Sequence, residues 1–291
     1  MSLPNFTYLA PTSLEEACNL LVQHQGKIRT KAGGTDLMVR LAQRAFKPEY
    51  IMGIRNIPNL AEISFNPDEG LRLGAMTLLS EVAENPVVQE HYPMLARAAR
   101  STATVQIRNM GTVMGNICNA SPSADNSPTL VAMNARIVAV SSAGERQIPI
   151  DEFFLGPGRS ALEPTEIARE ILVPTPSPRS GVSYQKISPR SKVDIAAVNV
   201  GAMVVVDEQG ACRQARICLG AVGPVPLRAA SAEEFLLGKT ITDAVAEEAG
   251  ALAGSDASPI SDVRASKEYR RLMVVILTKR ALLEARHGTG I

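Results

Sequence analysis

The chain has 291 residues, a length that suggests two domains when a domain averages about 150 residues. Its 30 Lys and Arg nearly balance its 29 Asp and Glu, and the net charge is +1. A surface of this kind creates no strong field to gather nucleic acid or anionic lipid, so we expect neither as a partner. Apolar residues make up 45% and charged residues 20%, an ordinary globular mixture that argues against a disordered chain.

Apolar stretches in the sequence are short. The run Leu272–Leu277 is followed by Thr278 and Lys279, whereas a membrane span needs about 20 apolar residues. The first residues lack the basic start and apolar run of a signal peptide. We therefore expect a soluble cytoplasmic protein without a membrane span.

In chain order, the first half alternates short apolar runs with helical patterns. Strands are predicted at 27–31, 50–54, 71–74, 135–140, 147–150 and 167–173, and helices at 37–45, 78–84 and 94–100. Three prolines then fall within five residues, at Pro174, Pro176 and Pro178. Because proline disrupts both helices and central strands, this segment is predicted to link two domains, 1–175 and 181–291.

After the linker, the pattern changes to long strands followed by helices. Three antiparallel strands are predicted at 182–187, 196–206 and 212–221, with a hairpin turn at 207–210. Helices are predicted at 232–237, 242–253 and 266–286, and the last carries an apolar stripe from Leu272 to Leu283. This order indicates a small α+β domain with a three-stranded sheet and three helices.

Metal ligands are scarce. The three histidines have no second His or Cys at ligand spacing, and the four cysteines, Cys18, Cys118, Cys212 and Cys218, include no Cys-x-x-Cys pair. We therefore expect buried free thiols and no zinc site or iron–sulfur cluster on this chain. Any redox chemistry would need a bound cofactor.

One glycine-bearing segment follows the predicted strand at 27–31. It consists of Lys31, Ala32, Gly33, Gly34, Thr35, Asp36 and Leu37. Paired glycines let the backbone approach an anion and expose successive N–H groups, and the positive end of the next helix points the same way. We expect Asp36 to cap that helix or to accept a hydrogen bond from a sugar hydroxyl. The alternative is a plain turn between strand and helix.

A second segment, at 107–125, is polar and nearly without periodicity. It carries two glycines, three asparagines and several hydroxyls, and it ends at Asp125, a carboxylate suited to ribose or ribityl hydroxyls. A long irregular loop within a compact domain is usually functional. The alternative is an ordered surface loop held by Asx turns.

Together the two segments resemble the paired FAD-binding motifs of the medium subunit of molybdenum hydroxylases, the xanthine dehydrogenase and carbon monoxide dehydrogenase group. The family motif Ala-Gly-Gly-Thr-Asp-Leu is present unchanged at 32–37. The motif Ile-Arg-Asn-x-Gly-Thr-x-Gly-Gly-Asn is present at 107–116, except that Met114 replaces a glycine, and Ala-Ser-Pro-x-x-Asp-x-x-Pro follows at 120–128. The exchange at Met114 would affect any main-chain contact or positive φ required there.

The resemblance continues after the linker, in Tyr184-Gln185-Lys186, Arg190 and the segment 194–196. It implies an FAD-binding domain of the vanillyl-alcohol-oxidase (PCMH) type, built of two subdomains. A small α+β domain related to the C-terminal domain of the CO dehydrogenase flavoprotein would follow.

The resemblance also implies a role for each matched residue. Residues 31–37 would surround the FAD pyrophosphate and ribityl chain, and three residues would hold the pyrophosphate from the other side: Thr112, Gly115 and Asn116. Asp125 would accept hydrogen bonds from flavin or ribose hydroxyls, Ile167 would line the ring pocket, and Lys186 would approach the isoalloxazine. We add Tyr184 as an aromatic that covers the ring; a place in the core is its alternative.

The implied activity is that of an oxidoreductase subunit with noncovalent FAD that transfers electrons. A small subunit with [2Fe–2S] clusters and a large molybdopterin subunit would be its partners, in a dimer of heterotrimers. The acceptor would be NAD, a quinone or oxygen. Two alternatives stay open: a stand-alone flavin-dependent oxidase or dehydrogenase, and a nucleotide-binding assembly module without catalytic activity.

Overall fold

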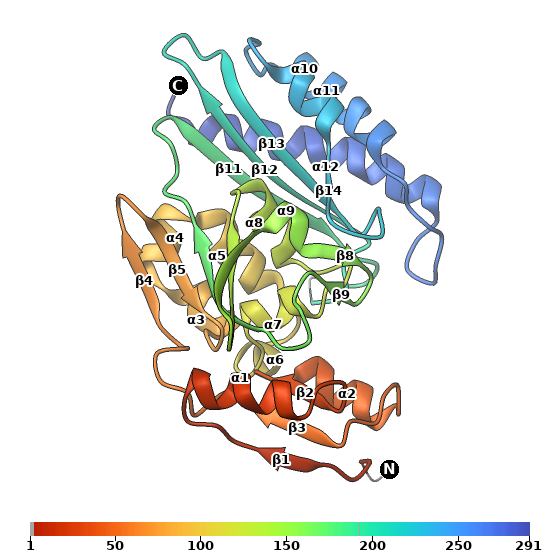
Figure 1. Cartoon of the computed structure of the whole chain (residues 1–291). Helices are drawn as coiled ribbons and strands as arrows, with labels where there is room; N and C mark the ends of the chain where they lie inside the picture. The colour runs from red at the N-terminus through yellow and green to blue at the C-terminus, as the bar shows by residue number, and fades with distance from the viewer. Residues whose placement is uncertain (1–2, 192) are drawn as a thin grey trace.

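The computed structural model describes residues 3–191 and 193–291, arranged as three successive layers along the molecule (Figure 1). The first layer is a parallel sheet with the strand order β1-β3-β2. Its elements are β1 (Thr7–Leu9), α1 (Leu14–Gln23), β2 (Ile28–Lys31), α2 (Thr35–Ala42) and β3 (Tyr50–Gly53). Parallel neighbours need crossover connections; α2 is the crossover from β2 to its neighbour β3, and α1 leads from β1 to β2 at the opposite edge of the sheet.

The middle layer contains an antiparallel sheet with the order β4-β5-β10-β6-β7. Its strands are β4 (Ile63–Asn66), β5 (Gly70–Gly74), β6 (Arg136–Ser141), β7 (Gly144–Pro149) and β10 (Ile167–Val173). A small hairpin, β8 (Phe154–Gly156) with β9 (Arg159–Ser160), lies beside it. The helices of this layer are α3 (Leu79–Glu84), α4 (Pro86–His91), α5 (Pro93–Ser101), α8 (Asn126–Ala132) and α9 (Ile150–Phe153).

The prediction of an irregular segment at 107–125 is wrong in part. The chain there forms two short helices, α6 (Val105–Arg108) and α7 (Val113–Cys118). Each begins after a threonine whose hydroxyl accepts a backbone N–H three residues on, Thr104 for α6 and Thr112 for α7. Helices of four and six residues are too short to produce a readable apolar period.

In the C-terminal layer the sheet has four strands and not the predicted three. β11 (Ser180–Ile187), β12 (Val198–Val206) and β13 (Cys212–Gly220) are followed by β14 (Leu227–Arg228), all antiparallel neighbours in this order. β14 was not predicted, because a strand of two residues is too short to show an alternation of apolar and polar side chains. It follows Pro226, a residue suited to sheet edges because it lacks an amide hydrogen.

The helices α10 (Ala230–Leu236), α11 (Asp243–Asp256) and α12 (Lys267–Gly288) complete this layer. α12 begins where predicted, because the Ser266 hydroxyl accepts the Tyr269 N–H at 3.2 Å. Its predicted apolar stripe is displaced: Leu272 is 54% exposed, and the buried face includes Val274 and Leu277.

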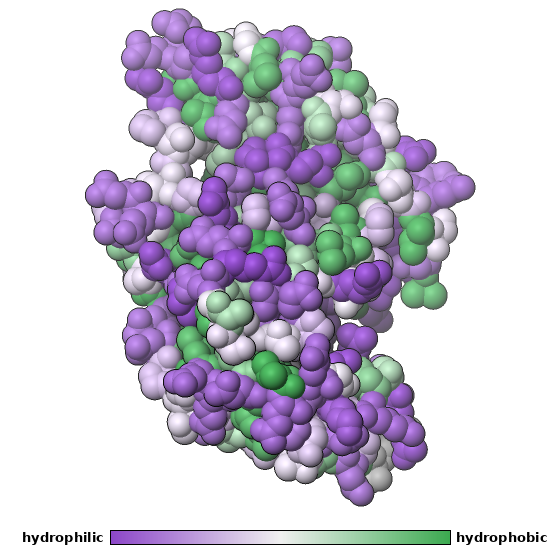
Figure 2. All heavy atoms as spheres, viewed as in Figure 1, coloured by the Kyte–Doolittle hydropathy of each residue, from purple (hydrophilic) through white to green (hydrophobic). Residues whose placement is uncertain are grey.

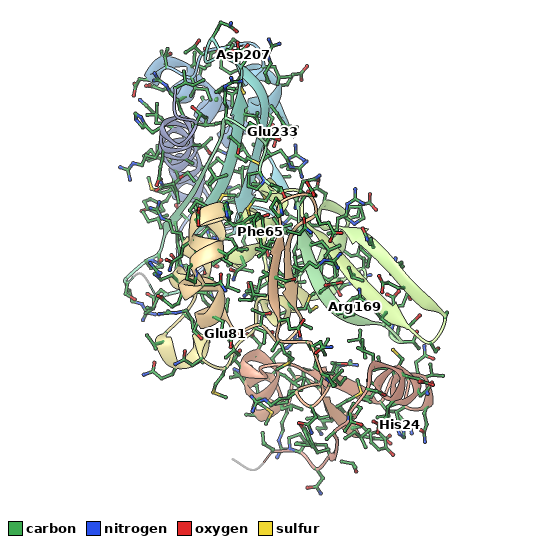
Figure 3. The ribbon with its side chains drawn as sticks, turned by 90° about the vertical axis from the view of Figure 1, so that its left-hand side faces the viewer. His24, Phe65, Glu81, Arg169, Asp207 and Glu233 are labelled. Carbon is green, nitrogen blue, oxygen red and sulfur yellow. The ribbon has the colours of Figure 1, made fainter. Side chains whose placement is uncertain are left out.

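Two hydrophobic clusters form the core. One spans the first two layers and also includes Tyr184 and Cys218 of the C-terminal sheet, and the other lies within the C-terminal layer. In the side view, Phe65 marks the middle layer, and Glu233 and Asp207 mark the C-terminal one (Figure 3). On the face in Figure 2, apolar side chains occur in scattered groups among polar ones. No helix in the described ranges is both long and apolar enough to cross a membrane.

Between the last two sheets, β10 ends at Val173 and β11 begins at Ser180. The proline-rich segment therefore connects two different sheets. The division into domains 1–175 and 181–291 stays a prediction.

Candidate functional site

A cavity of about 680 Å³ lies where the three layers meet. Most of its wall comes from segments that are distant in the sequence, within 29–37, 102–125, 158–168 and 193–195, and single residues between 40 and 79 complete it. The volume falls within the range of about 300–1,000 Å³ typical of small-molecule and cofactor sites. The cavity is therefore the first candidate for a binding site.

One wall of the cavity is the connection from β2 to α2. Gly34 is the N-cap of α2 and has φ +81°, a left-handed conformation that favours glycine. The first N–H that bonds within α2 is that of Met38, to the Gly34 carbonyl at 3.0 Å. The N–H groups of residues 33–37 donate to no described residue. Free amides at a helix start are ready donors for an anion.

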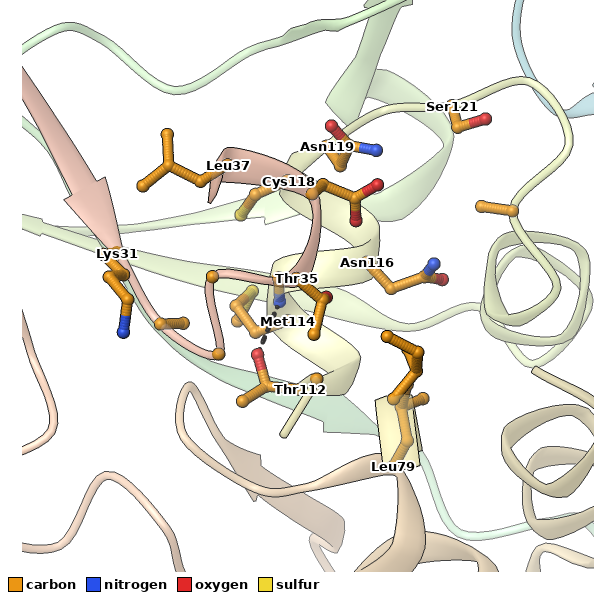
Figure 4. A pocket seen from close by; sticks show the side chains of 18 of the residues that line it. Lys31, Thr35, Leu37, Leu79, Thr112, Met114, Asn116, Cys118, Asn119 and Ser121 are labelled. Carbon is orange, nitrogen blue, oxygen red and sulfur yellow. Dashed lines mark hydrogen bonds between the residues drawn. The ribbon is translucent and has the colours of Figure 1, made fainter. Parts of the chain in front are cut away.

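The facing wall is the segment that leads into α7, and it touches the first wall directly. A Cβ added at Gly33 would lie 2.0 Å from the Met110 carbonyl oxygen and 2.8 Å from Gly111 Cα. Glycine is thus required for this close approach of two backbones. Figure 4 shows Thr35 beside α7, which carries Met114, Asn116 and Cys118. The two predicted segments therefore face one another across the cavity.

Helix α7 is positioned by its cap. The Thr112 hydroxyl accepts the Gly115 N–H at 2.9 Å, which orients the first turn toward the cavity. The Asn116 amide oxygen accepts a bond from Asn126 at 3.0 Å. Met114 is 3% exposed and lies within the helix without a positive φ. Its replacement of the family glycine is therefore compatible with the backbone conformation.

Asp125 is the buried carboxylate of the cavity, with 6% of its surface exposed. It accepts a 2.6 Å bond from the Tyr184 hydroxyl and pairs with the Lys186 ammonium at 2.9 Å. Burial raises the pKa of Asp125, and the charge of Lys186 opposes that rise.

The cavity brings together most of the residues predicted from the sequence. The ones that line it are Lys31, Ala32, Gly33, Gly34, Thr35, Asp36, Leu37, Thr112, Gly115, Asn116, Asp125 and Ile167. Tyr184 and Lys186 are not among the lining residues. Lys186 lies behind Asp125, and its ammonium also donates to the Ser101 carbonyl at 3.0 Å.

Two expectations for individual residues need correction. Tyr184 does not cover the cavity, because it is 1% exposed and packed in the core with its hydroxyl on Asp125. Asp36 does not cap α2 either; the cap is Gly34, with no side-chain bond. Asp36 lies in the first turn, where burial raises its pKa.

Other lining residues were not predicted. Phe46 lies under two cations, with the Arg40 and Arg29 guanidinium carbons 5.3 and 5.7 Å from its ring centroid. These three residues belong to no motif, although Arg40 lies one turn after Asp36 on α2.

Cys118 was expected to be a buried thiol; it is half-buried and lines the cavity. Desolvation raises its pKa to about 12, so the thiol is neutral at ordinary pH.

From the C-terminal layer, Val193, Asp194 and Ile195 also reach the cavity. Free amides, two backbones in contact and a buried carboxylate suit a long ligand that carries both phosphates and hydroxyls. The fold and site thus define a protein that binds a dinucleotide cofactor.

Comparison with known families identifies the cofactor. The FAD binding domain in molybdopterin dehydrogenase matches residues 4–176, and the CO dehydrogenase flavoprotein C-terminal domain matches residues 183–285. The chain therefore belongs to the family of FAD-binding medium subunits of the xanthine and carbon monoxide dehydrogenases. The resemblance drawn from the two motifs is confirmed, and the chain is an oxidoreductase flavoprotein subunit with FAD as its cofactor.

Individual relatives are similar over almost their whole length. The putative xanthine dehydrogenase FAD-binding subunit XdhB of Escherichia coli is 32% identical over 98% of this chain and 97% of its own. The carbon monoxide dehydrogenase medium chain of Hydrogenophaga pseudoflava is 35% identical over 96% of each chain. A carbon monoxide dehydrogenase structure from the same organism superposes with a TM-score of 0.93 at 34% identity, covering 98% of both chains. The structure of quinoline 2-oxidoreductase from Pseudomonas putida 86 superposes with a TM-score of 0.93 at 31% sequence identity, covering 100% of both chains.

Proposed function

We propose that this chain is the electron-transfer subunit of a multi-subunit molybdenum hydroxylase. Electrons from [2Fe–2S] clusters on a small partner subunit would reach the FAD held here and leave to an external acceptor such as NAD or a quinone. A large molybdopterin subunit would oxidise the substrate, within a dimer of heterotrimers. The relatives named as xanthine and carbon monoxide dehydrogenase chains support this assembly.

The observation that carries the proposal is the row of unbonded amides at 33–37, opposite the start of α7. These amides, with the Thr35 hydroxyl, would hold the FAD pyrophosphate from one side, and Thr112, Gly115 and Asn116 would hold it from the other. Asp125 would accept from ribityl or ribose hydroxyls, and Ile167 would line the ring pocket. Lys186 would act near the isoalloxazine, where it already balances the charge of Asp125.

When bound, FAD supplies both one-electron and two-electron redox chemistry. This chain would bind and orient it and exclude water. Two carboxylates beside the cavity are already engaged: Asp125 by Lys186, and Glu166 by Arg146, whose Nε lies 2.6 Å from Glu166. Asp194 is likewise paired with Arg190 at 3.0 Å, so of the four carboxylates among the described residues that line the cavity, Asp36 alone has no ion pair. This scarcity of free bases favours electron transfer over a stand-alone oxidase with its own substrate.

We further propose that the parallel sheet and the antiparallel five-stranded sheet are the two subdomains of a vanillyl-alcohol-oxidase-type domain. The proline-rich segment after Val173 would then be the boundary with the C-terminal domain, 181–291. A cytoplasmic location is proposed as well, because the four cysteines are free thiols and a reducing compartment keeps thiols reduced.

Two measurements test this function. The purified chain should show a flavin absorption band, and acid precipitation should release the flavin into the supernatant because the binding is noncovalent. A colourless protein at saturating FAD would refute the binding site. Copurification with an iron–sulfur chain and a molybdenum chain is the expected assembly, whereas a flavin-loaded monomer that a small substrate reduces unaided would establish the stand-alone alternative.

A further inference from the structure

A buried polar cluster joins the cavity to the C-terminal layer. It comprises Asp125 of the cavity wall, Tyr184 and Lys186 of β11, and Asn199 of β12. Tyr184 is 1% exposed, Asn199 0% and the Lys186 side chain 7%. Buried polar groups are costly unless they are satisfied. Hydrogen bonds join these four to one another and to the carbonyls of Ser101 and Ala124, while the Asn199 amide oxygen has no partner among the described residues.

Strand register explains why the three donors meet. Tyr184 and Lys186 are two residues apart on β11, so both side chains point to the same face. Asn199 is paired directly with Lys186 across the ladder. On the next strand, a Cβ at Gly220 would lie 1.9 Å from the Asn199 amide oxygen. The glycine on β13 leaves the space that Asn199 occupies.

Hydrogen-bond directions in the cluster are fixed. The Asn199 Nδ2 donates to the Tyr184 hydroxyl oxygen at 3.3 Å and to the Ala124 carbonyl at 3.2 Å. A tyrosine hydroxyl has a single hydrogen, and Tyr184 directs it to Asp125 Oδ1 at 2.6 Å. Asn199 thus holds both the backbone before Asp125 and the donor that binds its carboxylate.

Lys186 and Tyr184 act on Asp125 differently. The ammonium lies 2.9 Å from Oδ1 and 3.0 Å from Oδ2, so it balances the charge without selecting one oxygen. Tyr184 binds Oδ1 alone and therefore restricts rotation of the carboxylate. An ionised carboxylate offers about four acceptor positions. These contacts leave acceptor capacity on Oδ2 for a ligand in the cavity.

We propose that Tyr184 is a positioning residue, whose hydrogen bond holds Asp125 in the orientation that accepts a hydroxyl of FAD. This inference rests on the proposed role of Asp125 in FAD binding. It gives the C-terminal domain a part in cofactor binding through side chains that do not line the cavity.

The test is the substitution Tyr184→Phe in the full chain, with FAD affinity measured by isothermal titration. We expect the Kd for FAD to rise roughly tenfold, less than for the loss of a direct charged hydrogen bond, because Tyr184 acts on FAD only through Asp125. The matched control is Tyr92→Phe, because Tyr92 is also 1% exposed and its hydroxyl donates to the Val173 carbonyl at 3.4 Å. The control should leave the Kd unchanged.

A double-mutant cycle distinguishes an effect of Tyr184 through Asp125 from a general destabilisation of the core that would also weaken FAD binding. In an Asp125→Asn background, Tyr184→Phe should change the Kd no further. The same tenfold loss in that background, or an equal loss in Tyr92→Phe, would overturn the proposal. If the unmodified chain binds no FAD, the proposed function fails; if it binds FAD and Tyr184→Phe binds equally well, only this inference fails.

The pH profile of FAD binding gives a second readout. The groups that face Asp125 are Lys186 and Tyr184 from β11, while the Ser101 carbonyl of α5 binds Lys186 and Asn199 of β12 is uncharged. Arg97 of α5 acts electrostatically on Tyr184. The Tyr184 hydroxyl lowers the pKa of Asp125, so Tyr184→Phe should lose FAD affinity at a higher pH than the unmodified chain as the solution is acidified. Identical profiles would contradict the positioning role.

Discussion

Gly33 allows the sharpest perturbation of the site. The substitution Gly33→Ala places a Cβ 2.0 Å from the Met110 carbonyl oxygen and 2.8 Å from Gly111 Cα. Ordinary contact begins at about 3.4 Å, so one of the two backbones must move by more than an ångström. Neither contact is the end of a flexible side chain, and no rotamer change relieves it.

The expected magnitude follows from this geometry. Adding an atom to a closely packed contact destabilises the folded state by about 1–3 kcal/mol. A clash between two backbones should cost an amount near the upper end of this range. The two walls of the cavity would separate, and donors from both could no longer reach one pyrophosphate together. We expect FAD affinity to fall about 100-fold, or about 2.8 kcal/mol.

The assay is an FAD titration of the full chain, followed by quenching of flavin fluorescence, with thermal unfolding measured in parallel. Gly26→Ala is the matched control, since Gly26 precedes β2, has φ +81° and has no atom within 4 Å of its added Cβ. It should lose about 1–2 kcal/mol of stability through backbone strain and retain its FAD affinity. Tight FAD binding by Gly33→Ala would refute the contact between the two walls as a requirement of the site.

Three further outcomes are expected. Asp125→Asn should weaken FAD binding by about 1.5–3 kcal/mol, the cost of losing a charged hydrogen bond, measured by isothermal titration. Asp262 is ionised at neutral pH. Burial alone would raise its pKa, but hydrogen bonds from Arg264 and Arg270 outweigh burial and lower the pKa to about 2. Its stabilisation is present above about pH 4 and is lost as the pH falls toward 2, so urea unfolding of Asp262→Asn should depend less on pH in that window. Cys118, with a pKa near 12, should resist iodoacetamide at pH 8, as peptide mass mapping would show.

Long, patterned elements of this fold were predictable from the sequence. The strand at 167–173 and the long final helix have apolar runs or caps that define them locally. β14 and α6 were not predictable, because two and four residues contain about one period of a strand or helix pattern, so no repeat can be recognised. The face of α12 was also misread, since Leu272 belongs to the apolar run but is exposed, whereas Val274, two residues further on, is buried.

For the site, the sequence predicted the segments that line the cavity but not the buried polar contacts behind them. The glycine pair and Asp125 stand in recognisable local patterns, and they line the cavity. Tyr184 was misassigned because an aromatic residue two positions from Lys186, for which we propose a role near the flavin, can face a ligand or the core. The choice depends on Asn199 and Asp125, which are 15 and 59 residues away in the chain.

A glycine can be required for two physical reasons that sequence alone does not separate. It can leave room for a ligand, or it can let another part of the chain approach. The sequence suggests the first reason for Gly33, whereas the structure adds the second, because the Met110 carbonyl occupies the space. A glycine kept only for the cofactor would tolerate alanine when FAD is absent. Gly33→Ala should therefore lower the unfolding temperature of the FAD-free chain, and an unchanged value would mean that the glycine serves the cofactor alone.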